Sequence, residues 1–314
     1  MRKPLKVTLI TLGSVLAIPV VLLGTTFAVN AVATRHELAS IKDYGQRVDV
    51  DGHEMNVVIT GTGDDTIVLL PGLGTASPWL DYQPLVTKLE QDHRVVVVEP
   101  FGYGLSDQTD VPRTTKNIVE EVHTALQEVD ITRYTLMGHS IAGLYALTYA
   151  EQYRDELRAF VGIDTSVPNQ PGWDDPTSTA GITDLRNLGI TRALSALSGD
   201  PYAGLPYSDD EKQQMGYFTT RNASEPTVLN ELENASANFG AAATATFPAD
   251  LPVLLFIATQ DGDFDNWKNL HDGQVARLQN GSVVPLDGTH YLHHTQSETI
   301  AQDTDEFLSA LPVR

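Results

Sequence analysis

The chain has 314 residues, of which 41% are hydrophobic, and a formal net charge of −21; this is enough apolar material for one large α/β domain or two small ones. It contains no cysteine, which excludes disulfides, thiolate zinc sites and thiol catalysis. The first 34 residues contribute +3, so the remainder carries −24, a charge that repels phosphate groups and leads us to expect no nucleic-acid partner.

The N-terminal segment, residues 1–35, predicts a membrane anchor. Three basic residues among the first six precede an uncharged stretch from Val7 to about Val29. At 1.5 Å rise per residue this stretch is about 34 Å long, enough to cross a bilayer. Positive charge before the span predicts that the N-terminus stays inside and that the rest of the chain lies outside, at the cell membrane. The alternatives are a cleaved secretory signal ending at Ala31-Val32-Ala33, which would leave a secreted protein, and a buried core helix.

A short polar stalk leads into two strands joined by a tight turn at Asp51-Gly52. The next two apolar runs lack polar alternation, which is typical of strands buried on both faces. From there strands and helices alternate, which implies a mostly parallel α/β sheet with helices on both faces. Eight strands are predicted, over residues 47–50, 54–60, 66–70, 94–98, 134–137, 159–164, 253–258 and 282–286. Helices are predicted over 78–91, 114–129, 140–153, 266–279 and 298–311.

The alternation breaks between about residues 166 and 248. This interval has three helical patterns, over 182–197, 208–219 and 224–243, and no buried-strand pattern. An all-helical insertion late in a parallel sheet predicts a helical cap over the carboxyl ends of the strands. Its larger apolar residues predict an apolar pocket, although many of them would form the cap's own core: Leu185, Leu188, Leu194, Leu197, Tyr202, Leu205, Tyr207, Met215, Tyr217 and Phe218.

The segment Gly138-His139-Ser140-Ile141-Ala142-Gly143 predicts a nucleophilic serine. It follows an apolar strand and precedes a helix-forming run. A strand-to-helix turn of this kind exposes the serine hydroxyl and is so sharp that the positions two residues before and after it must be small. Gly138 and Ala142 meet that requirement, so we predict that Ser140 is the catalytic nucleophile.

Such a serine needs a histidine as base, and the histidine needs a carboxylate to orient it. His290 follows the last strand in a glycine-containing loop and is the predicted base. Asp261 follows strand 253–258 and gives the chain order Ser, Asp, His, so it is the predicted acid. Asp164 and Asp263 remain as alternatives.

Two backbone amides are expected to stabilise the oxyanion. One belongs to Ile141, next to the nucleophile. The other belongs to Leu73, because Pro71 in the turn after strand 66–70 has no N–H and Gly72 lets the chain bend. Gly72 and His139 are also expected to line the substrate pocket.

Two further histidines, His293 and His294, lie close to His290 in the sequence and suggest a metal site. Such a site would need a third ligand that the sequence does not indicate, so we expect no metal and no cofactor.

Nearly all of residues 47–312 resembles an α/β-hydrolase. Besides the serine turn, Glu99–Asp107 resembles the loop after the family's fourth strand, and Gly288-x-His290 is similar to the loop that carries the family's base. The family's oxyanion turn usually begins with His where this chain has Pro71, which leaves the backbone donors in place. The resemblance implies an α/β-hydrolase domain over 36–314 with a cap, in a layout similar to membrane-anchored α/β-hydrolases of Gram-positive bacteria.

The resulting hypothesis is a serine hydrolase that cleaves a small to medium apolar carboxylester through an acyl-enzyme. Dehalogenases and epoxide hydrolases of this fold carry Asp at the turn, and Ser140 argues against both. The alternatives are an aminopeptidase or amidase, a C–C bond hydrolase of the same fold, and a non-catalytic binding module. The expected partners are a small-molecule ester and, through the N-terminal helix, the membrane; the natural substrate and the oligomeric state stay open.

Overall fold

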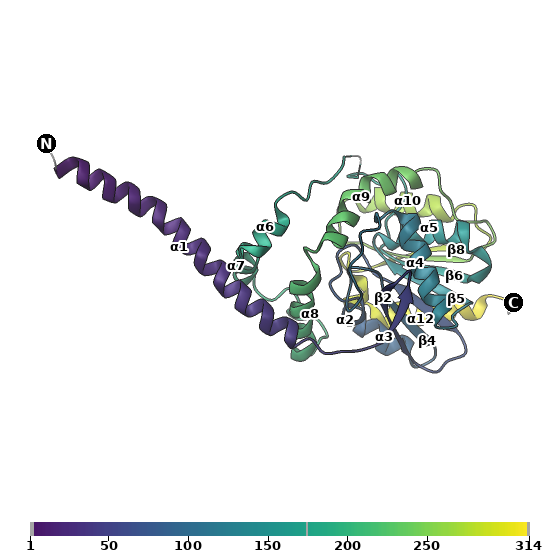
Figure 1. Cartoon of the computed structure of the whole chain (residues 1–314). Helices are drawn as coiled ribbons and strands as arrows, with labels where there is room; N and C mark the ends of the chain where they lie inside the picture. Colours follow the sequence, from purple (N-terminus) through teal and green to yellow (C-terminus); the bar gives the residue numbers. More distant parts are fainter. Residues whose placement is uncertain (1–2, 174, 313–314) are drawn as a thin grey trace.

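A sheet of eight strands forms the centre of the protein (Figure 1). The computed structural model describes residues 3–173 and 175–312, and the side chains of the first helix only from residue 17 on. The strand order is β1-β2-β4-β3-β5-β6-β7-β8, with antiparallel pairing of β1 to β2 and of β2 to β4 and parallel pairing elsewhere. The mostly parallel eight-stranded sheet is therefore confirmed. The strands are β1 (Gln46–Val50), β2 (His53–Thr60), β3 (Thr66–Leu70), β4 (Arg94–Glu99), β5 (Tyr134–His139), β6 (Leu157–Ile163), β7 (Val253–Ala258) and β8 (Gly281–Leu286).

Helices cover both faces of this sheet (Figure 1). On one face α4 (Thr115–Glu128) and α5 (Ala142–Gln152) bury their apolar sides, and on the other α3 (Gln83–Leu89) and α12 (Ser297–Ala310) do so. Each face has its own apolar core, which is why the central strands are uninterrupted runs of Val, Leu and Ile. The other helices outside the insertion and the first helix are α2 (Pro78–Asp81), α10 (Phe264–Val275) and α11 (Leu292–Thr295).

The helix predicted over 78–91 is two helices, α2 and α3, with Tyr82 between them. Pro84 lies in the first turn of α3, where its missing N–H costs nothing. In a continuous helix the same proline would remove a hydrogen bond to residue 80 and clash with its carbonyl. Asp81 is thereby the last residue of α2, and Tyr82 between the two helices is fully buried.

The insertion between β6 and β7 consists of α6 (Ile182–Asn187), α7 (Ile190–Ser198), α8 (Asp209–Asn222) and α9 (Pro226–Ala242). Within 166–173 and 175–248 no strand is formed. The helix predicted over 182–197 is interrupted because Gly189 adopts a left-handed conformation (φ +74°).

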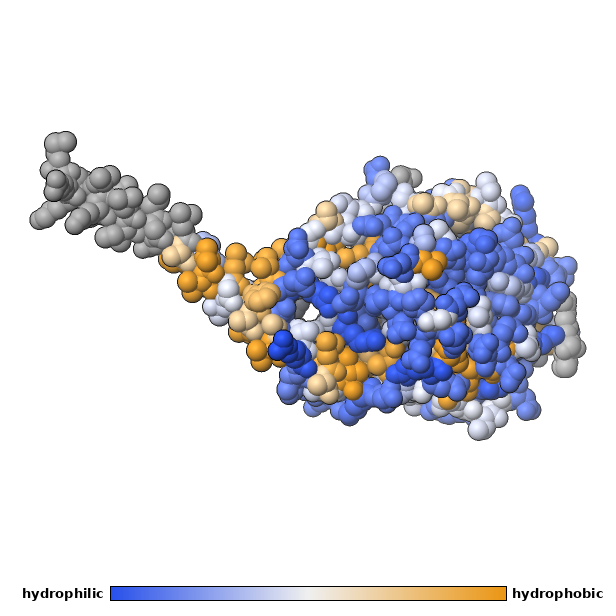
Figure 2. Space-filling model, in the orientation of Figure 1, coloured by the Kyte–Doolittle hydropathy of each residue, from blue (hydrophilic) through white to orange (hydrophobic). Residues whose placement is uncertain are grey.

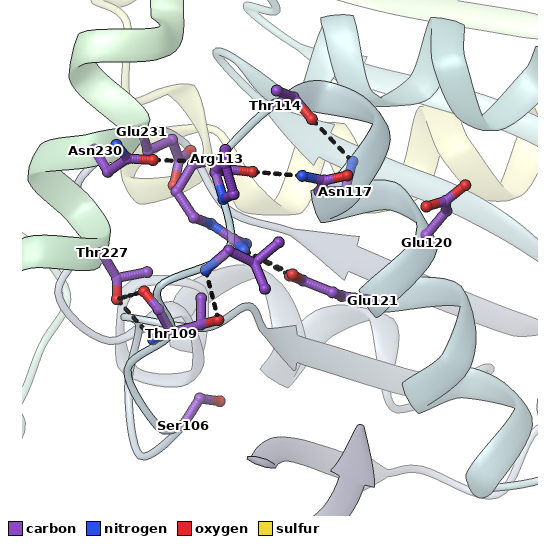
Figure 3. Close-up of polar contacts among 12 residues, drawn as sticks. Ser106, Thr109, Arg113, Thr114, Asn117, Glu120, Glu121, Thr227, Asn230 and Glu231 are labelled. Atoms are coloured by element: carbon purple, nitrogen blue, oxygen red, sulfur yellow. Dashed lines mark hydrogen bonds and ion pairs between the residues drawn. The ribbon is translucent and has the colours of Figure 1, made fainter. Parts of the chain in front are cut away.

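Buried polar contacts join the last cap helix, α9, to the loop after β4 (Figure 3). The Arg113 amide donates to Asn230 Oδ1 (2.9 Å) and the Thr109 amide to Thr227 Oγ1 (2.9 Å). The fully buried Arg113 guanidinium also pairs with Glu121 on α4 (2.8 Å). These contacts fix one end of the cap to the sheet layer.

The first helix, α1 (Lys3–Ala39), projects away from the globular part (Figure 1). Its segment Ala17–Ala39 is long and apolar enough to cross a membrane, and none of it is buried inside the protein. That exposure excludes the alternative of a buried core helix. The predicted span begins at Val7, and the side chains before Ala17 lie outside the described part.

The buried pair between Arg113 and Glu121 generates a stability prediction. Arg113→Met keeps an apolar stem but leaves the carboxyl group of Glu121 without its partner. We expect the unfolding free energy to fall by about 3–5 kcal/mol, measured as a lower urea midpoint of the detergent-solubilised chain. The matched control is Lys116→Met, which removes the exposed pair with Glu120 on the same helix and should cost less than about 1 kcal/mol. Equal midpoints for the two variants would contradict this.

Candidate active site

Ser140 lies at the turn between β5 and α5 in a strained left-handed conformation (φ 55°). For a residue with a side chain this costs about 1–3 kcal/mol, and it persists only when the surroundings fix it. Here the Ser140 carbonyl accepts hydrogen bonds from the amides of Ser166 (2.7 Å) and Gly143 (3.0 Å). A Cβ added at Gly138 would lie 2.6 Å from the Ala142 Cβ, which is the steric reason for the small residues in the sequence pattern.

The predicted base, His290, is hydrogen-bonded to a carboxylate, and that carboxylate belongs to Asp164. His290 Nδ1 lies 2.6 Å from Asp164 Oδ2, and Asp164 Oδ1 accepts from the Ala258 amide (2.9 Å) and from Trp267 Nε1 (2.7 Å). Asp261 was the predicted partner of His290, whereas the hydrogen-bond partner in the structure is Asp164, one of the two alternatives. The physical reason is that Asp164 follows β6 directly, in a left-handed turn (φ 44°) that directs its side chain toward the base loop.

Asp261 is nevertheless close by. One carboxylate oxygen of Asp261, one of Asp164 and one His290 nitrogen all lie within 4.8 Å of one another. Asp261 Oδ2 is buried, and it accepts no hydrogen bond from any residue that the structure describes. Asp261 is therefore a neighbour of the base without being its hydrogen-bond partner. The other alternative, Asp263, caps α10 by accepting from the Asn266 amide (3.2 Å).

Burial raises the pKa of Asp164, but the hydrogen bonds from His290, Ala258 and Trp267 outweigh it and leave the pKa below its ordinary value. Asp164 is thus a carboxylate at neutral pH, and it fixes His290 with Nδ1–H directed at Asp164 and Nε2 free. A histidine held in this tautomer can accept a proton at Nε2.

His139 connects the serine turn to the base loop. Its Nε2 lies 3.0 Å from the His290 carbonyl oxygen, and the two imidazole centroids are 4.5 Å apart. Burial, followed by the charges of His293 and His290, holds the pKa of His139 well below its ordinary value, so it is a neutral donor. In the described part of the chain no hydrogen bond joins Ser140 Oγ to His290.

The turn after β3 passes directly over the serine. A Cβ placed on Gly72 would lie 3.1 Å from the Ser140 Cβ and 2.7 Å from His139 Nδ1. The Gly74 amide donates to the Tyr103 hydroxyl (3.1 Å). The amides of Leu73 and Ile141, the predicted oxyanion donors, donate to no other group among the described residues. Two unpaired backbone donors next to a serine are what a developing oxyanion requires.

A cavity of about 420 Å³ opens beside this site. Three of the predicted pocket residues line it, namely Tyr202, Leu205 and Met215. Gly72 and His139, also predicted to line the pocket, are buried and are not among the lining residues. Leu73, predicted as an oxyanion donor, also lines the cavity. The further lining residues come from the turns after β3 and β8, from α2, α8 and α11, and from the segments that follow α7 and α8: Gly74, Thr75, Ala76, Ser77, Asp81, Pro201, Thr219, Ala223, Thr289, Tyr291, His294 and Thr295.

The other predicted pocket residues have different positions. Tyr207 and Phe218 are buried with Leu80 in a small separate core between the cap and α2. Leu185, Leu194 and Leu197 are exposed on the surface of the cap. An apolar residue in the cap sequence therefore did not by itself indicate a place in the pocket.

A second polar cluster lies at the edge of the cavity and uses Asp81, His293 and His294. His293 Nε2 lies 2.8 Å from Asp81 Oδ2 and His294 Nε2 2.9 Å from Asp81 Oδ1, and all three side chains are buried. A metal site at His293 and His294 would need a third ligand, and Asp81 is in a position to be that ligand. Imidazoles and a carboxylate are ligand types that zinc takes. This cluster and the group of Asp164, Asp261 and His290 are therefore the two sets of described residues that could hold a metal ion. The members of the Asp81 cluster also satisfy one another by hydrogen bonds.

The comparisons with known proteins agree with this architecture. A family model described as the alpha/beta hydrolase fold matches residues 65–296. The chain is 26% identical to the uncharacterized protein YbdG of the Gram-positive bacterium Bacillus subtilis, over 98% of this chain and 97% of that protein. It is 32% identical to a putative carbamate hydrolase, RutD, of Pantoea ananatis, over 75% of this chain and 85% of that protein. The crystal structure of an epoxide hydrolase from Vigna radiata superposes with a TM-score of 0.66 at 15% identity, over 85% of this chain and 97% of that one.

The cluster around Asp81 yields a pH-dependent prediction. Burial raises the pKa of Asp81, but the two imidazoles outweigh it and hold the pKa well below its ordinary value. The Asp81 carboxylate therefore contributes its full stabilisation above the unfolded-state pKa of about 4. This contribution is lost progressively as the pH falls from there toward the lower pKa of the folded state. We expect Asp81→Asn to lower the unfolding free energy by about 1–3 kcal/mol at neutral pH, with a difference that narrows below about pH 4.

Urea unfolding of both proteins across the acid range measures this difference. Asp210→Asn is the control, because Asp210 pairs with Lys42 at the surface and should contribute less than about 1 kcal/mol. A difference between wild type and Asp81→Asn that stays constant down to pH 3 would show that the charge of Asp81 does not contribute.

Proposed function

Because the chain belongs to the alpha/beta hydrolase family and is a hydrolase, we propose that it cleaves an apolar carboxylester with Ser140, His290 and Asp164 as its triad. The observation that carries this proposal is the 2.6 Å contact between His290 Nδ1 and the Asp164 carboxylate. This contact orients His290. The carbonyl oxygen of His290 is in turn hydrogen-bonded to His139, which directly precedes the strained Ser140.

In the proposed reaction Ser140 Oγ attacks the ester carbonyl while His290 Nε2 takes the hydroxyl proton. Asp164 stabilises the imidazolium, and the amides of Leu73 and Ile141 bind the oxyanion. His290 then gives its proton to the leaving alcohol, and water releases the acid from the acyl-enzyme. Catalytic hydrogen bonds are often long before the substrate binds, which is consistent with the lack of a hydrogen bond between Ser140 Oγ and His290 among the described residues.

The cavity favours an uncharged substrate of modest size. None of its described lining residues is Lys or Arg, and Tyr202, Leu205 and Met215 supply apolar walls. The one acid among them, Asp81, has each oxygen engaged by an imidazole, which disfavours its use as a clamp for a free amino terminus. We therefore rank a carboxylester above an aminopeptidase substrate.

An amide or carbamate is the second candidate, and the name of the Pantoea ananatis relative favours it. Both groups present a carbonyl that the same serine could attack. A C–C bond hydrolase and a non-catalytic binding module are further candidates of lower rank, and the second of these is disfavoured by the oriented base.

We also propose that α1 stays attached as a single-pass anchor with its N-terminus inside. Cap residues contact α1 at Thr26 and Asn30, which precede the signal-peptidase-like Ala31-Val32-Ala33. Cleavage there would remove both contacts and leave the cap without part of its support.

The nucleophile can be tested with p-nitrophenyl esters of increasing acyl length. We expect Ser140→Ala to lower kcat by a factor of at least about 1,000, because it removes the attacking oxygen, and to abolish labelling by a fluorophosphonate. Ser282→Ala, at an exposed position of β8, is the control and should match the wild type. If the wild type is not labelled and Ser140→Ala hydrolyses the esters as fast as Ser282→Ala, the binding module is favoured. If the wild type hydrolyses only amides or carbamates, the second candidate is favoured.

The acid can be tested by comparing two isosteric variants. Asp164→Asn removes the carboxylate that fixes the His290 tautomer, so we expect kcat to fall by about 10,000-fold. Asp261→Asn leaves that hydrogen bond intact and should reduce kcat by less than about tenfold. The reverse order of effects would return the role of the acid to Asp261.

A further inference from the structure

The cap helix α7 carries an apolar surface that no other described part of the protein covers. Leu194 is 60% and Leu197 84% exposed. From residue 193 to 199 every residue is exposed and none is charged. An exposed helical face of this kind marks an interaction site. Figure 2 shows apolar side chains gathered where α1 meets the cap, and Figure 1 shows α7 beside α1.

Specific contacts fix the start of α7 against α1. Gly189 approaches α1 so closely that a Cβ there would lie 2.6 Å from the Thr26 carbonyl oxygen. Asn30 donates to the Arg186 carbonyl (3.0 Å) and accepts from Arg192 Nε (2.9 Å). Arg192 also pairs with Glu37 through both terminal nitrogens, at 2.5 and 2.7 Å. The cap therefore cannot slide along α1 without breaking a charged pair.

These contacts set the level of α7 relative to a membrane. Thr26 lies within the apolar part of α1, whereas Glu37 and His36 mark its polar end. At 1.5 Å per residue, Thr26 and Glu37 are about 16 Å apart along the helix axis. With α1 across a bilayer, the start of α7 lies near the boundary between hydrocarbon and headgroups. Exposed apolar residues of α1, among them Val29 and Val32, lie between these two levels of the helix.

We propose that α7 is a second membrane contact, with the face around Leu194 and Leu197 inserted into the outer leaflet beside α1. The proposal rests on the anchor proposed above. A bilayer fits this surface because α7 lies beside the apolar part of α1 and residues 193–199 are exposed and uncharged. Helices of this type lie in the interface with the apolar face about 5–10 Å deep.

The contact would also bring the cavity to the membrane. The segment directly after α7 includes Pro201, Tyr202 and Leu205, which line the cavity beside the base loop. A helix held at the headgroup level thus leads straight into the cavity wall. The substrate class that this arrangement suits is an uncharged ester that dissolves in the bilayer and reaches the site without crossing bulk water.

Because the chain has no cysteine, single cysteines can carry a fluorophore at chosen positions. We would reconstitute the full-length variants Leu197→Cys, Val21→Cys and Val111→Cys, each labelled with an environment-sensitive probe, in phosphatidylcholine vesicles. Val21, on α1, reports the anchor, and Val111 is an exposed apolar residue of the loop before α4. Lipids brominated on the upper acyl chain serve as quenchers.

We expect blue-shifted emission and quenching by bromine for the probes at 21 and 197, and neither for the probe at 111. Quenching at 21 without quenching at 197 would overturn the membrane contact of α7 and leave the anchor intact. Quenching at neither position would overturn the anchor and the contact together. Equal quenching at 197 and 111 would show unspecific adsorption and would also overturn the proposal.

Substitution of the same face separates the contact from the chemistry. Leu194→Glu combined with Leu197→Glu places charge in the interface and should slow hydrolysis of a long-chain ester dissolved in the vesicles severalfold. Hydrolysis of a water-soluble short ester should be unchanged, because neither leucine lies at the cavity. Equal rates on the vesicle substrate for variant and wild type would overturn the proposal, and no hydrolysis of either ester by the wild type would instead contradict the proposed function.

Discussion

The site depends on one constraint, which is that parallel strands carry their carboxyl ends to the same edge of the sheet. Ser140 follows β5, Asp164 follows β6 and His290 follows β8, three strands within one continuous parallel block. A rigid hydrogen-bonded sheet thereby holds side chains 126 residues apart in sequence at 2.6 Å. The positive φ values of Ser140 and Asp164 add local strain at this edge, and strain of this kind survives only on a scaffold that fixes the turns.

Several imidazoles lie in contact with one another around His290. His139 contacts both His290 and His293, at 4.5 and 4.7 Å between centroids, and His293 contacts His294 at 4.4 Å. Burial lowers the pKa of His139 and His293, which keeps like charges from accumulating. Asp81 supplies an anion to His293 and His294 and thereby holds α11, the helix that follows the base. The base loop is thus held at both ends by hydrogen bonds rather than by packing alone.

The cap has two attachments with different chemistry. At α9, buried pairs and tyrosine hydroxyls join it to the sheet layer: Glu231 accepts from Tyr103, whose oxygen also accepts from the Gly74 amide in the turn over the serine. At α6 and α7, Asn30, Arg192 and Glu37 join it to α1. The apolar wall of the cavity, formed by Pro201, Tyr202, Leu205 and Met215, lies in the chain between these two attachments. The cap segment that we propose to contact the membrane thus leads into the wall of the cavity in which we propose that the substrate binds.

The sheet, its eight strands, the serine turn and the apolar first helix can be predicted from the amino-acid sequence. Each depends on local chemistry: runs of β-branched residues, small residues beside Ser140, and absence of charge. The loop of His290 is predicted in the same way. The bond of His290 to Asp164 rather than to Asp261 becomes visible only in the folded chain, because chain order is compatible with an acid after either β6 or β7. Two further features could not be predicted from the sequence. They are the hydrogen bonds of Asp81 with His293 and His294, and the exposure of Leu194 and Leu197. Each depends on distances between segments far apart in the chain, which local patterns do not encode.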